Sequence, residues 1–506
     1  MDWILEVFMK KNQYDIERQH NKGKLHAIER IELLLDKNSF FEIGSEITHD
    51  CKQFGMDSKP APYDGVITGF GTISGKNVAI YSQDFTVIGG TLGRMHGAKI
   101  AGVIQSAIEM GCPVIGINDS GGARIQEGVN ALAGYGEIFY HNTKASGYIP
   151  QISIIAGPCA GGAVYSPGLT DFIFVIEEIS QMFVTGPAVV KRALFQDVTA
   201  EDLGGAKMHA SKSGVAHFRS ESEINCYHKV RQLLNLVPHC VSHPGPKFPN
   251  HYVRKTQARI DRFLPEKANA AYDIKSVINQ MTDKGSFIEV MEENAPNMVV
   301  GFAEISDVAI GIIANQPKVM AGVINCDASD KTARFVRYCD AFNIPILTLV
   351  DVPGFMPGLD QEQKGIIRHG AKVLYAYSEA TVPKITVIIR KAFGGAYIAM
   401  CSKHLGADFV YAWPTAQIAV MGAEGAVEIV YRRELKAAAD PQGVREEKIQ
   451  QYNTEFLNPH LAAKVGYVDE VIQPDQTRQM IFGSLKLLSR KKTTELVQKK
   501  HGNVPL

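Results

Sequence analysis

The two halves of this 506-residue sequence carry the same arrangement of proline, aspartate and paired glycines. Each anchor recurs 232 to 237 positions later: Pro113 and Pro345, Asp119 and Asp351, Gly161-Gly162 and Gly394-Gly395, Asp171 and Asp408, and Gly186 and Gly422. So little drift over five anchors indicates an internal duplication. The chain is therefore expected to fold as two related domains, since a chain of this length exceeds one ordinary core.

Each half alternates helical and strand patterns. Residues 96–110 repeat apolar side chains at helical spacing, whereas the run that ends at Asp119 and residues 151–156 are continuously apolar, as in buried strands. Residues 331–342 and 346–351 repeat the helix and the strand in the second half. The alternation predicts βαβ crossovers and a mostly parallel sheet in each half, so the fold class is α/β.

The composition of two stretches indicates where the first half begins and where the two halves are joined. Residues 1–40 read as helical and polar, and the chain starts without the layout of a signal peptide. Four prolines between residues 237 and 250 exclude both helix and central strand, so this stretch is the predicted linker. The predicted domains are residues 1–245 and 246–506.

Bulk properties exclude several classes of protein. The formal net charge is zero and the pI is about 7.2, which gives no sign of nucleic-acid binding. No apolar run approaches the length of a membrane span. The eight cysteines form no CxxC pair, so neither a metal site nor a disulfide framework is expected. These features predict a cytoplasmic protein.

The paired glycines are the candidate chemical groups. Both Gly161-Gly162 and Gly394-Gly395 follow an apolar strand and precede a helix. Glycine lets the main chain approach a ligand, and the first N–H groups of a helix are free to stabilise an oxyanion. Close packing of helix on strand is the alternative explanation. Asp119 and Asp351 are open to two interpretations, as general bases or as residues that stabilise the turns beside them.

Other known glycine-rich and catalytic motifs are absent from the sequence or are wrongly spaced. The sequence has no correctly spaced dinucleotide fingerprint or Walker A motif, and it lacks G-x-S-x-G and H-E-x-x-H. Spacing establishes no catalytic carboxylate pair and no Ser/His/Asp order. Oxyanion turns without a side-chain nucleophile favour enolate chemistry, for which acyl-CoA thioesters are common substrates.

Long motifs resemble those of biotin-dependent acyl-CoA carboxyltransferases. They cover residues 118–128, 157–167, 183–187, 203–209, 213–217, 351–358, 396–397, 402–408, 412–417 and 420–423. Residues 499–506 are similar to the end of propionyl-CoA carboxylase beta subunits. The resemblance implies two tandem crotonase-like ββα-spiral domains, assembled as a homohexamer that is a dimer of trimers.

The resemblance also implies a mechanism. The N-terminal domain takes acyl-CoA and the C-terminal domain takes carboxybiotin, and they meet across a subunit boundary. Carboxybiotin releases CO2, biotin removes the α-proton of the thioester, and the enolate attacks CO2. The implied catalytic residues are Gly161, Gly162, Gly395 and Ala396. The implied substrate-binding residues are Gly121, Gly122, Ala123, Ala160 and Ile398, and those on the carboxybiotin side are Gly354, Phe355, Phe393, Gly394 and Gly422.

Biotin is expected on a partner chain, because no lysine lies in a Met-Lys-Met-type biotinylation site and no ATP-binding signature is present. A biotin carboxylase and a biotin carboxyl carrier are therefore the implied partners. Ile398 departs from propionyl-selective members, which usually have aspartate there. The main prediction is carboxylation of a short-chain, propionyl-like acyl-CoA. A methylmalonyl- or glutaconyl-CoA decarboxylase, or a transcarboxylase, running the reverse transfer is the first alternative, and a scaffold without turnover is the second.

Overall fold

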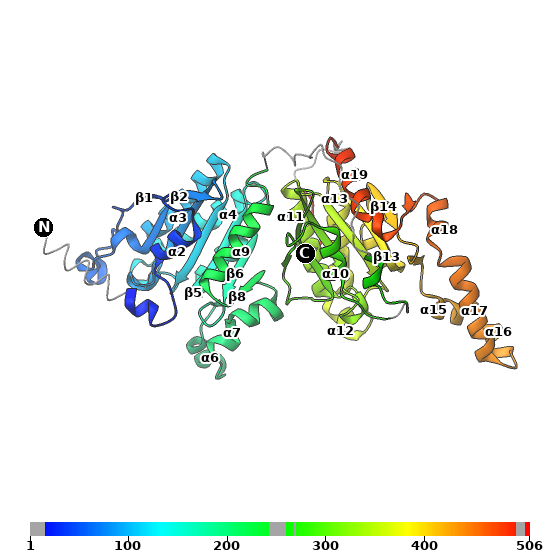
Figure 1. Ribbon diagram of the computed structural model, residues 1–506. Helices are drawn as coiled ribbons and strands as arrows, with labels where there is room; N and C mark the ends of the chain where they lie inside the picture. The colour runs from blue at the N-terminus through cyan, green and yellow to red at the C-terminus, as the bar shows by residue number, and fades with distance from the viewer. Residues whose placement is uncertain (1–15, 242–259, 268–269, 492–500) are drawn as a thin grey trace. The chain divides into compact units, whose positions relative to one another are not determined.

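The computed structural model describes residues 16–241, 260–267, 270–491 and 501–506, and the chain divides into two compact units, Met1–His243 and Pro244–Leu506 (Figure 1). We call them unit 1 and unit 2. The start of the predicted N-terminal helix, residues 1–15, lies outside the described residues. So do the predicted linker from residue 242 onward and residues 499–500 of the C-terminal motif.

Unit 1 contains one sheet in the order β1-β2-β3-β4-β5-β6-β8, with β7 paired to the end of β5. Its strands are β1 Phe41–Ile43, β2 Val66–Ile73, β3 Lys76–Gln83, β4 Val114–Ser120, β5 Gln151–Ala160, β6 Phe172–Ile176, β7 Gln181–Phe183 and β8 Phe218–Ser220. The pairs β1–β2 and β2–β3 are antiparallel, and every later pair is parallel.

Unit 2 repeats this topology, in the order β9-β10-β11-β12-β13-β14-β16 with β15 paired to the end of β13. Its strands are β9 Ile288–Val290, β10 Met298–Ile305, β11 Val308–Asn315, β12 Ile346–Val352, β13 Lys384–Phe393, β14 Phe409–Ala412, β15 Gln417–Ala419 and β16 Glu470–Val471. Lys76 and Val308, which begin β3 and β11, are 232 positions apart, and Gln151 and Lys384, which begin β5 and β13, are 233 apart. The duplication seen in the sequence is therefore a duplication of the sheet.

Helices join the parallel strands, as the alternating pattern predicts, and further helices lie before the first strand and after the last strand of each sheet. In unit 1 they are α2 Ala27–Leu34, α3 Arg94–Met110, α4 Val129–Ala145, α5 Tyr165–Leu169, α6 Pro187–Leu194, α7 Ala200–Gly204, α8 Ala206–Met208 and α9 Glu223–Leu236. In unit 2 they are α10 Ile274–Met281, α11 Cys326–Ala341, α12 Leu359–Lys364, α13 Ile366–Glu379, α14 Gly394–Ala399, α15 Ala423–Val430, α16 Arg432–Ala437, α17 Pro441–Phe456, α18 Pro459–Lys464 and α19 Thr477–Leu488. Across the described residues, no helix is long and apolar enough to span a membrane.

Helix packing explains two details of the sequence. α3 and α4 approach closely where Gly97 faces Gly134, because a Cβ at Gly97 would lie 2.6 Å from the Cα of Gly134. The predicted helix over residues 1–40 is interrupted within the described part, since a turn with Gly23 at φ +69° separates helical residues 16–20 from α2. The left-handed backbone at Gly23 cannot continue a right-handed helix. α2 packs on the unit with Arg30 in its buried face, and Lys24 in the stretch before it is also buried.

Candidate functional site

The first glycine turn lies at the end of the central strand β5. The strand ends at Ala160, and a 3-10 helix, η5 (Gly161–Val164), begins at once and leads into α5. Gly161 has φ +64°, a conformation that a residue with a side chain rarely adopts. The N–H groups at this helix start have no intrahelical acceptor, so they are available to an anion.

The second turn repeats this geometry one unit later. β13 ends at Phe393 and α14 begins at Gly394, which has φ +58°. Gly394 is thus the counterpart of Gly161, and Gly395-Ala396 is the counterpart of Gly162-Ala163. The predicted donor pairs, Gly161-Gly162 and Gly395-Ala396, are therefore out of step by one residue. Ala163, the counterpart of Ala396, is not among the residues predicted from the sequence, although both turns read Gly-Gly-Ala.

The surroundings of the first turn include several predicted residues. A Cβ at Gly122, which has φ +100°, would lie 3.0 Å from the carbonyl oxygen of Ala160, so the loop after β4 runs beside the end of β5. Gly121 donates its N–H to the carbonyl of Gly89, and Ala123 forms a bridge with Leu92. The ring of Tyr135 closes the space beside Gly162, where a Cβ would lie 3.2 Å from two ring carbons.

The second turn is more open. A Cβ at Gly395 would meet no atom within 4 Å. Phe393 packs against Gly422, where a Cβ would lie 3.3 Å from a ring carbon, so these residues and Gly394 lie together. Ile398 is exposed on α14.

Gly354 and Phe355 lie on the loop after β12. The carbonyl of Gly354 accepts from the N–H of Ile324 at 3.1 Å, and Phe355 packs on Gly370 of α13. The residues predicted for the carboxybiotin side therefore fall into two groups. Phe393, Gly394 and Gly422 lie together at the second turn, and Gly354 and Phe355 lie on the loop after β12.

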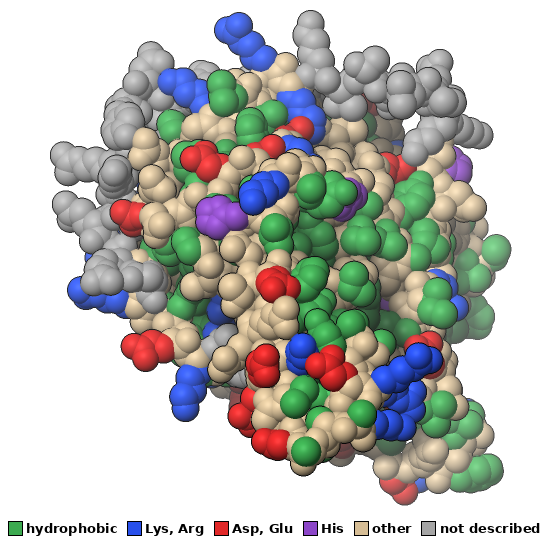
Figure 2. Space-filling view, turned by 90° about the vertical axis from the view of Figure 1, so that its right-hand side faces the viewer, with side chains coloured by type: hydrophobic (Ala, Val, Ile, Leu, Met, Phe, Trp, Pro, Cys, Tyr) green, Lys and Arg blue, Asp and Glu red, His purple; other side chains and the backbone are tan. Residues whose placement is uncertain are grey.

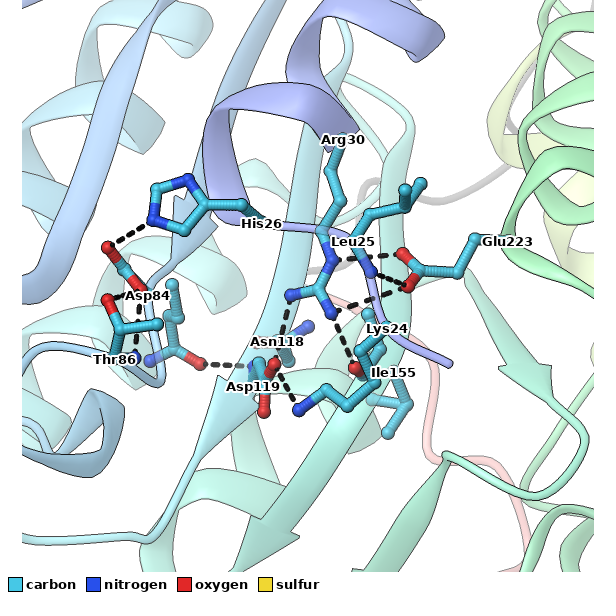
Figure 3. Close-up of polar contacts among 12 residues, drawn as sticks. Lys24, Leu25, His26, Arg30, Asp84, Thr86, Asn118, Asp119, Ile155 and Glu223 are labelled. Atoms are coloured by element: carbon cyan, nitrogen blue, oxygen red, sulfur yellow. Dashed lines mark hydrogen bonds and ion pairs between the residues drawn. The ribbon is translucent and has the colours of Figure 1, made fainter. Parts of the chain in front are cut away.

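The two repeated aspartates are buried and paired with cations. Asp119 accepts from Lys24 at 2.6 Å and from Arg30 at 3.0 Å (Figure 3). Burial raises the pKa of Asp119 above its ordinary value, and the charges of Arg30 and Lys24 oppose that shift. Asp351 accepts from Arg390 at 2.9 Å. Carboxylates closed in this way favour the second interpretation, that they stabilise the turns rather than remove a proton from a ligand.

A second buried ionic cluster fixes the loop after β4. Arg124 lies 2.6 Å from Asp64 and 2.8 Å from Glu127, and it also donates to the carbonyl of Thr91 at 2.8 Å. Sequence reasoning did not single out Arg124. The available signal was its place within the glycine-bounded motif of residues 118–128.

Comparisons with known proteins point to one family. A model described as the carboxyl transferase domain matches residues 18–504. The chain is 52% identical to the methylmalonyl-CoA decarboxylase subunit alpha of Propionigenium modestum over 97% of this chain and 95% of that protein. It is 53% identical to the propionyl-CoA carboxylase carboxyltransferase subunit of Haloferax mediterranei, with the same coverage.

A solved structure has the same fold. The crystal structure of transcarboxylase 12S, described as a hexamer with methylmalonyl-coenzyme A bound, superposes with a TM-score of 0.94 at 47% identity, covering 99% of this chain and 98% of that one. The match confirms the predicted fold, two tandem crotonase-like domains related by duplication.

Proposed function

The chain belongs to the carboxyl transferase domain family, and on that premise we propose that it moves a carboxyl group between biotin on a partner chain and the α-carbon of a short-chain acyl-CoA. It is an enzyme, the carboxyltransferase subunit of a biotin-dependent system. The observation that carries the proposal is the pair of glycine turns at equivalent strand ends, Gly161-Gly162-Ala163 and Gly394-Gly395-Ala396.

Each turn supplies backbone donors to one oxyanion. The N–H groups at Gly162 and Ala163 hold one developing negative charge, and those at Gly395 and Ala396 hold the other. The open space beside Gly395 is consistent with a ligand at the second turn. Carboxybiotin, when bound, supplies the carboxyl group and the base that takes the α-proton. This division explains why the chain needs no general base of its own and why Asp119 is used for structure.

The acyl group and the direction of transfer are also part of the proposal. We assign a short-chain, propionyl-like acyl-CoA and carboxylation as the main function. Decarboxylation or transcarboxylation is the second candidate, because relatives of both kinds are about equally similar and because Ile398 presents an apolar side chain. The scaffold alternative is disfavoured, since both turns keep their left-handed glycines.

Assembly as a homohexamer is part of the proposal, by analogy with the transcarboxylase 12S hexamer. Matching apolar side chains support it. Two exposed residues on α4 and one just before it each have an exposed apolar counterpart on α12 or α13, 234 or 235 positions later. The pairs are Ile125 and Leu359, Leu132 and Ile367, and Tyr140 and Leu374. Figure 2 shows hydrophobic side chains exposed among charged ones on one face of the molecule. Exposed apolar surface of this kind is typical of protein interfaces.

The proposed partners are a biotin carboxyl carrier and a biotin carboxylase, and the proposed location is the cytoplasm. A direct test supplies the purified chain with a carrier protein bearing ¹⁴C-carboxybiotin and with acetyl-, propionyl-, butyryl- and glutaryl-CoA in turn. We expect label in the propionyl product first. Incubation of labelled methylmalonyl- or glutaconyl-CoA with uncharged carrier measures the reverse transfer. Label in no product in either direction would contradict the proposed function.

A further inference from the structure

Both glycine turns follow a bulge in the strand that carries them. Residues 156–158 of β5 face the single residue Asp119 of β4, and residues 389–391 of β13 face Asp351 of β12. A bulge bends its strand and redirects the residues beyond it. Each bulge therefore sets the direction in which the strand end and the following turn point.

Unit 2 stabilises its bulge with groups from the strand itself and from a nearby loop. Arg390 donates to one oxygen of Asp351 at 2.9 Å, and the N–H of Lys391 donates to the other at 3.1 Å. The hydroxyl of Thr415 donates to the carbonyl of Ile389 at 2.7 Å. The carboxylate of Asp351 and the carbonyl of Ile389 in this bulge therefore both have hydrogen-bond partners.

Unit 1 lacks these strand groups. The counterparts of Arg390 and Lys391, 233 positions earlier, are Gly157 and Pro158. Glycine supplies no cation, and proline has no N–H to donate. Consistent with this loss, Oδ1 of Asp119 is buried and has no hydrogen-bond partner among the described residues.

The segment around α2 supplies the missing cations. Nη1 of Arg30 donates to Asp119 at 3.0 Å, and Nη2 donates to the carbonyl of Ala156 at 2.8 Å (Figure 3). Nζ of Lys24 lies 2.6 Å from the same carboxylate oxygen as Nη1. Glycine at position 157 is required for this arrangement, because a Cβ there would lie 2.6 Å from Nζ of Lys24 and 2.0 Å from Oδ1 of Asp119.

A further carboxylate locks the segment in place. Glu223 of α9 accepts from Nε of Arg30 at 2.9 Å and from the N–H of Leu25 at 2.8 Å. Two cations and two carboxylates are thus buried together with a balanced charge, as a buried ionic group requires.

We propose that Lys24 and Arg30 are positioning residues for the first glycine turn, because they hold the β5 bulge as Arg390 and Thr415 hold the β13 bulge. The segment that carries Lys24 and Arg30, which precedes the first sheet, then positions the first glycine turn and has no such role at the second. The effect on carboxyl transfer rests on the proposed function, whereas the effect on the turn itself does not.

Hydrogen–deuterium exchange of the assembled protein tests the effect on the turn. Lys24→Met leaves the bonds of Arg30 to Glu223 and Ala156 in place, so the variant is expected to fold. We expect exchange in residues 154–164 to quicken at least tenfold, with residues 387–397 unchanged. Lys22→Met, the same substitution at an exposed residue nearby, is the matched control and should leave exchange in both peptides unchanged. A wild-type rate in residues 154–164 of Lys24→Met overturns the proposal.

Thr415→Val is the reciprocal variant, expected to quicken residues 387–397 and to leave 154–164 unchanged. Kinetics then tests positioning. We expect Lys24→Met to lower kcat about tenfold with KM for acyl-CoA within twofold, and Lys24→Arg to recover most of the loss. A loosened turn with unchanged kcat also overturns the proposal. If the wild-type protein transfers no carboxyl group, the proposed function fails, while the exchange pattern still decides whether the two residues hold the turn.

Discussion

Replacing Gly395 with alanine separates the chemistry of the second turn from its folding. A Cβ at this position meets no atom within 4 Å, and the backbone of Gly395 is not left-handed, so the methyl group fits without strain. Alanine within a helix is more stable than glycine by about 1 kcal/mol. The free energy of unfolding of Gly395→Ala should therefore be equal to that of the wild type or higher by up to about 1 kcal/mol.

The effect on transfer should be large and of opposite sign. In the proposed function the oxyanion lies in the open space beside Gly395, next to the N–H groups of Gly395 and Ala396, so a methyl group added there would displace it from these donors. Loss of one oxyanion donor raises the barrier by about 3 kcal/mol, which corresponds to a decrease in kcat of about a hundredfold. We expect a decrease of this size in carboxyl transfer from carboxybiotin, measured alongside the urea midpoint and the elution volume of the assembly.

Gly483→Ala is the matched control, because Gly483 lies within α19 and a Cβ there also meets nothing within 4 Å. It should keep wild-type transfer. Gly162→Ala provides a contrast, since its methyl group would press on Tyr135 at 3.2 Å and should lower both stability and transfer. Wild-type turnover in an intact Gly395→Ala protein would refute the assignment of an oxyanion site to the second turn.

Three further predictions concern charge and specificity. Burial, reinforced by the charge of Arg124, lowers the pKa of His96 from 6.5 to about 3. Between these two pH values the imidazole is protonated in the unfolded chain and neutral in the folded chain. Stability should fall as pH drops from 6.5 towards 3 by at most about 1.4 kcal/mol per pH unit, and urea midpoints of His96→Gln should show a smaller slope. Arg124→Met leaves Asp64 and Glu127 buried without their cation and should cost about 3–5 kcal/mol in urea unfolding, whereas a loss below 1 kcal/mol contradicts that role. Ile398→Asp should lower kcat/KM for butyryl-CoA relative to propionyl-CoA about fourfold, because one methylene loses about 0.8 kcal/mol of apolar contact, and an unchanged ratio removes Ile398 from the acyl pocket.

The sequence was sufficient for the elements that repeat. Continuous apolar runs before Asp119 and Asp351 predicted β4 and β12, because buried parallel strands need apolar side chains on both faces. The glycine pairs predicted the strand-to-helix turns, since the left-handed backbone that begins each turn, at Gly161 and Gly394, is a conformation that few residues other than glycine adopt. The position of the donors within each turn could not be read, because it depends on which residue begins the helix.

Contacts between distant segments were beyond the sequence. Lys24 and Arg30 meet Asp119 across roughly ninety positions, and no local pattern records such a contact. One signal was present, because Arg30 lies on the apolar stripe of α2 and a buried cation must have a partner. The identity of that partner required the fold. Likewise, the fact that Gly157 stands where the second half has Arg390 is seen only when the equivalent strands β5 and β13 are aligned by their bulges.

A structure of the assembled protein with a non-reactive acyl-CoA analogue, whose thioester is replaced by a ketone, tests the central claim most directly. The account predicts the ketone oxygen within about 3.1 Å of the backbone nitrogens of one turn, either Gly162 and Ala163 or Gly395 and Ala396. A ketone oxygen bound elsewhere, with water or side chains as its only donors, would contradict the claim that the duplicated glycine turns are the sites of oxyanion stabilisation.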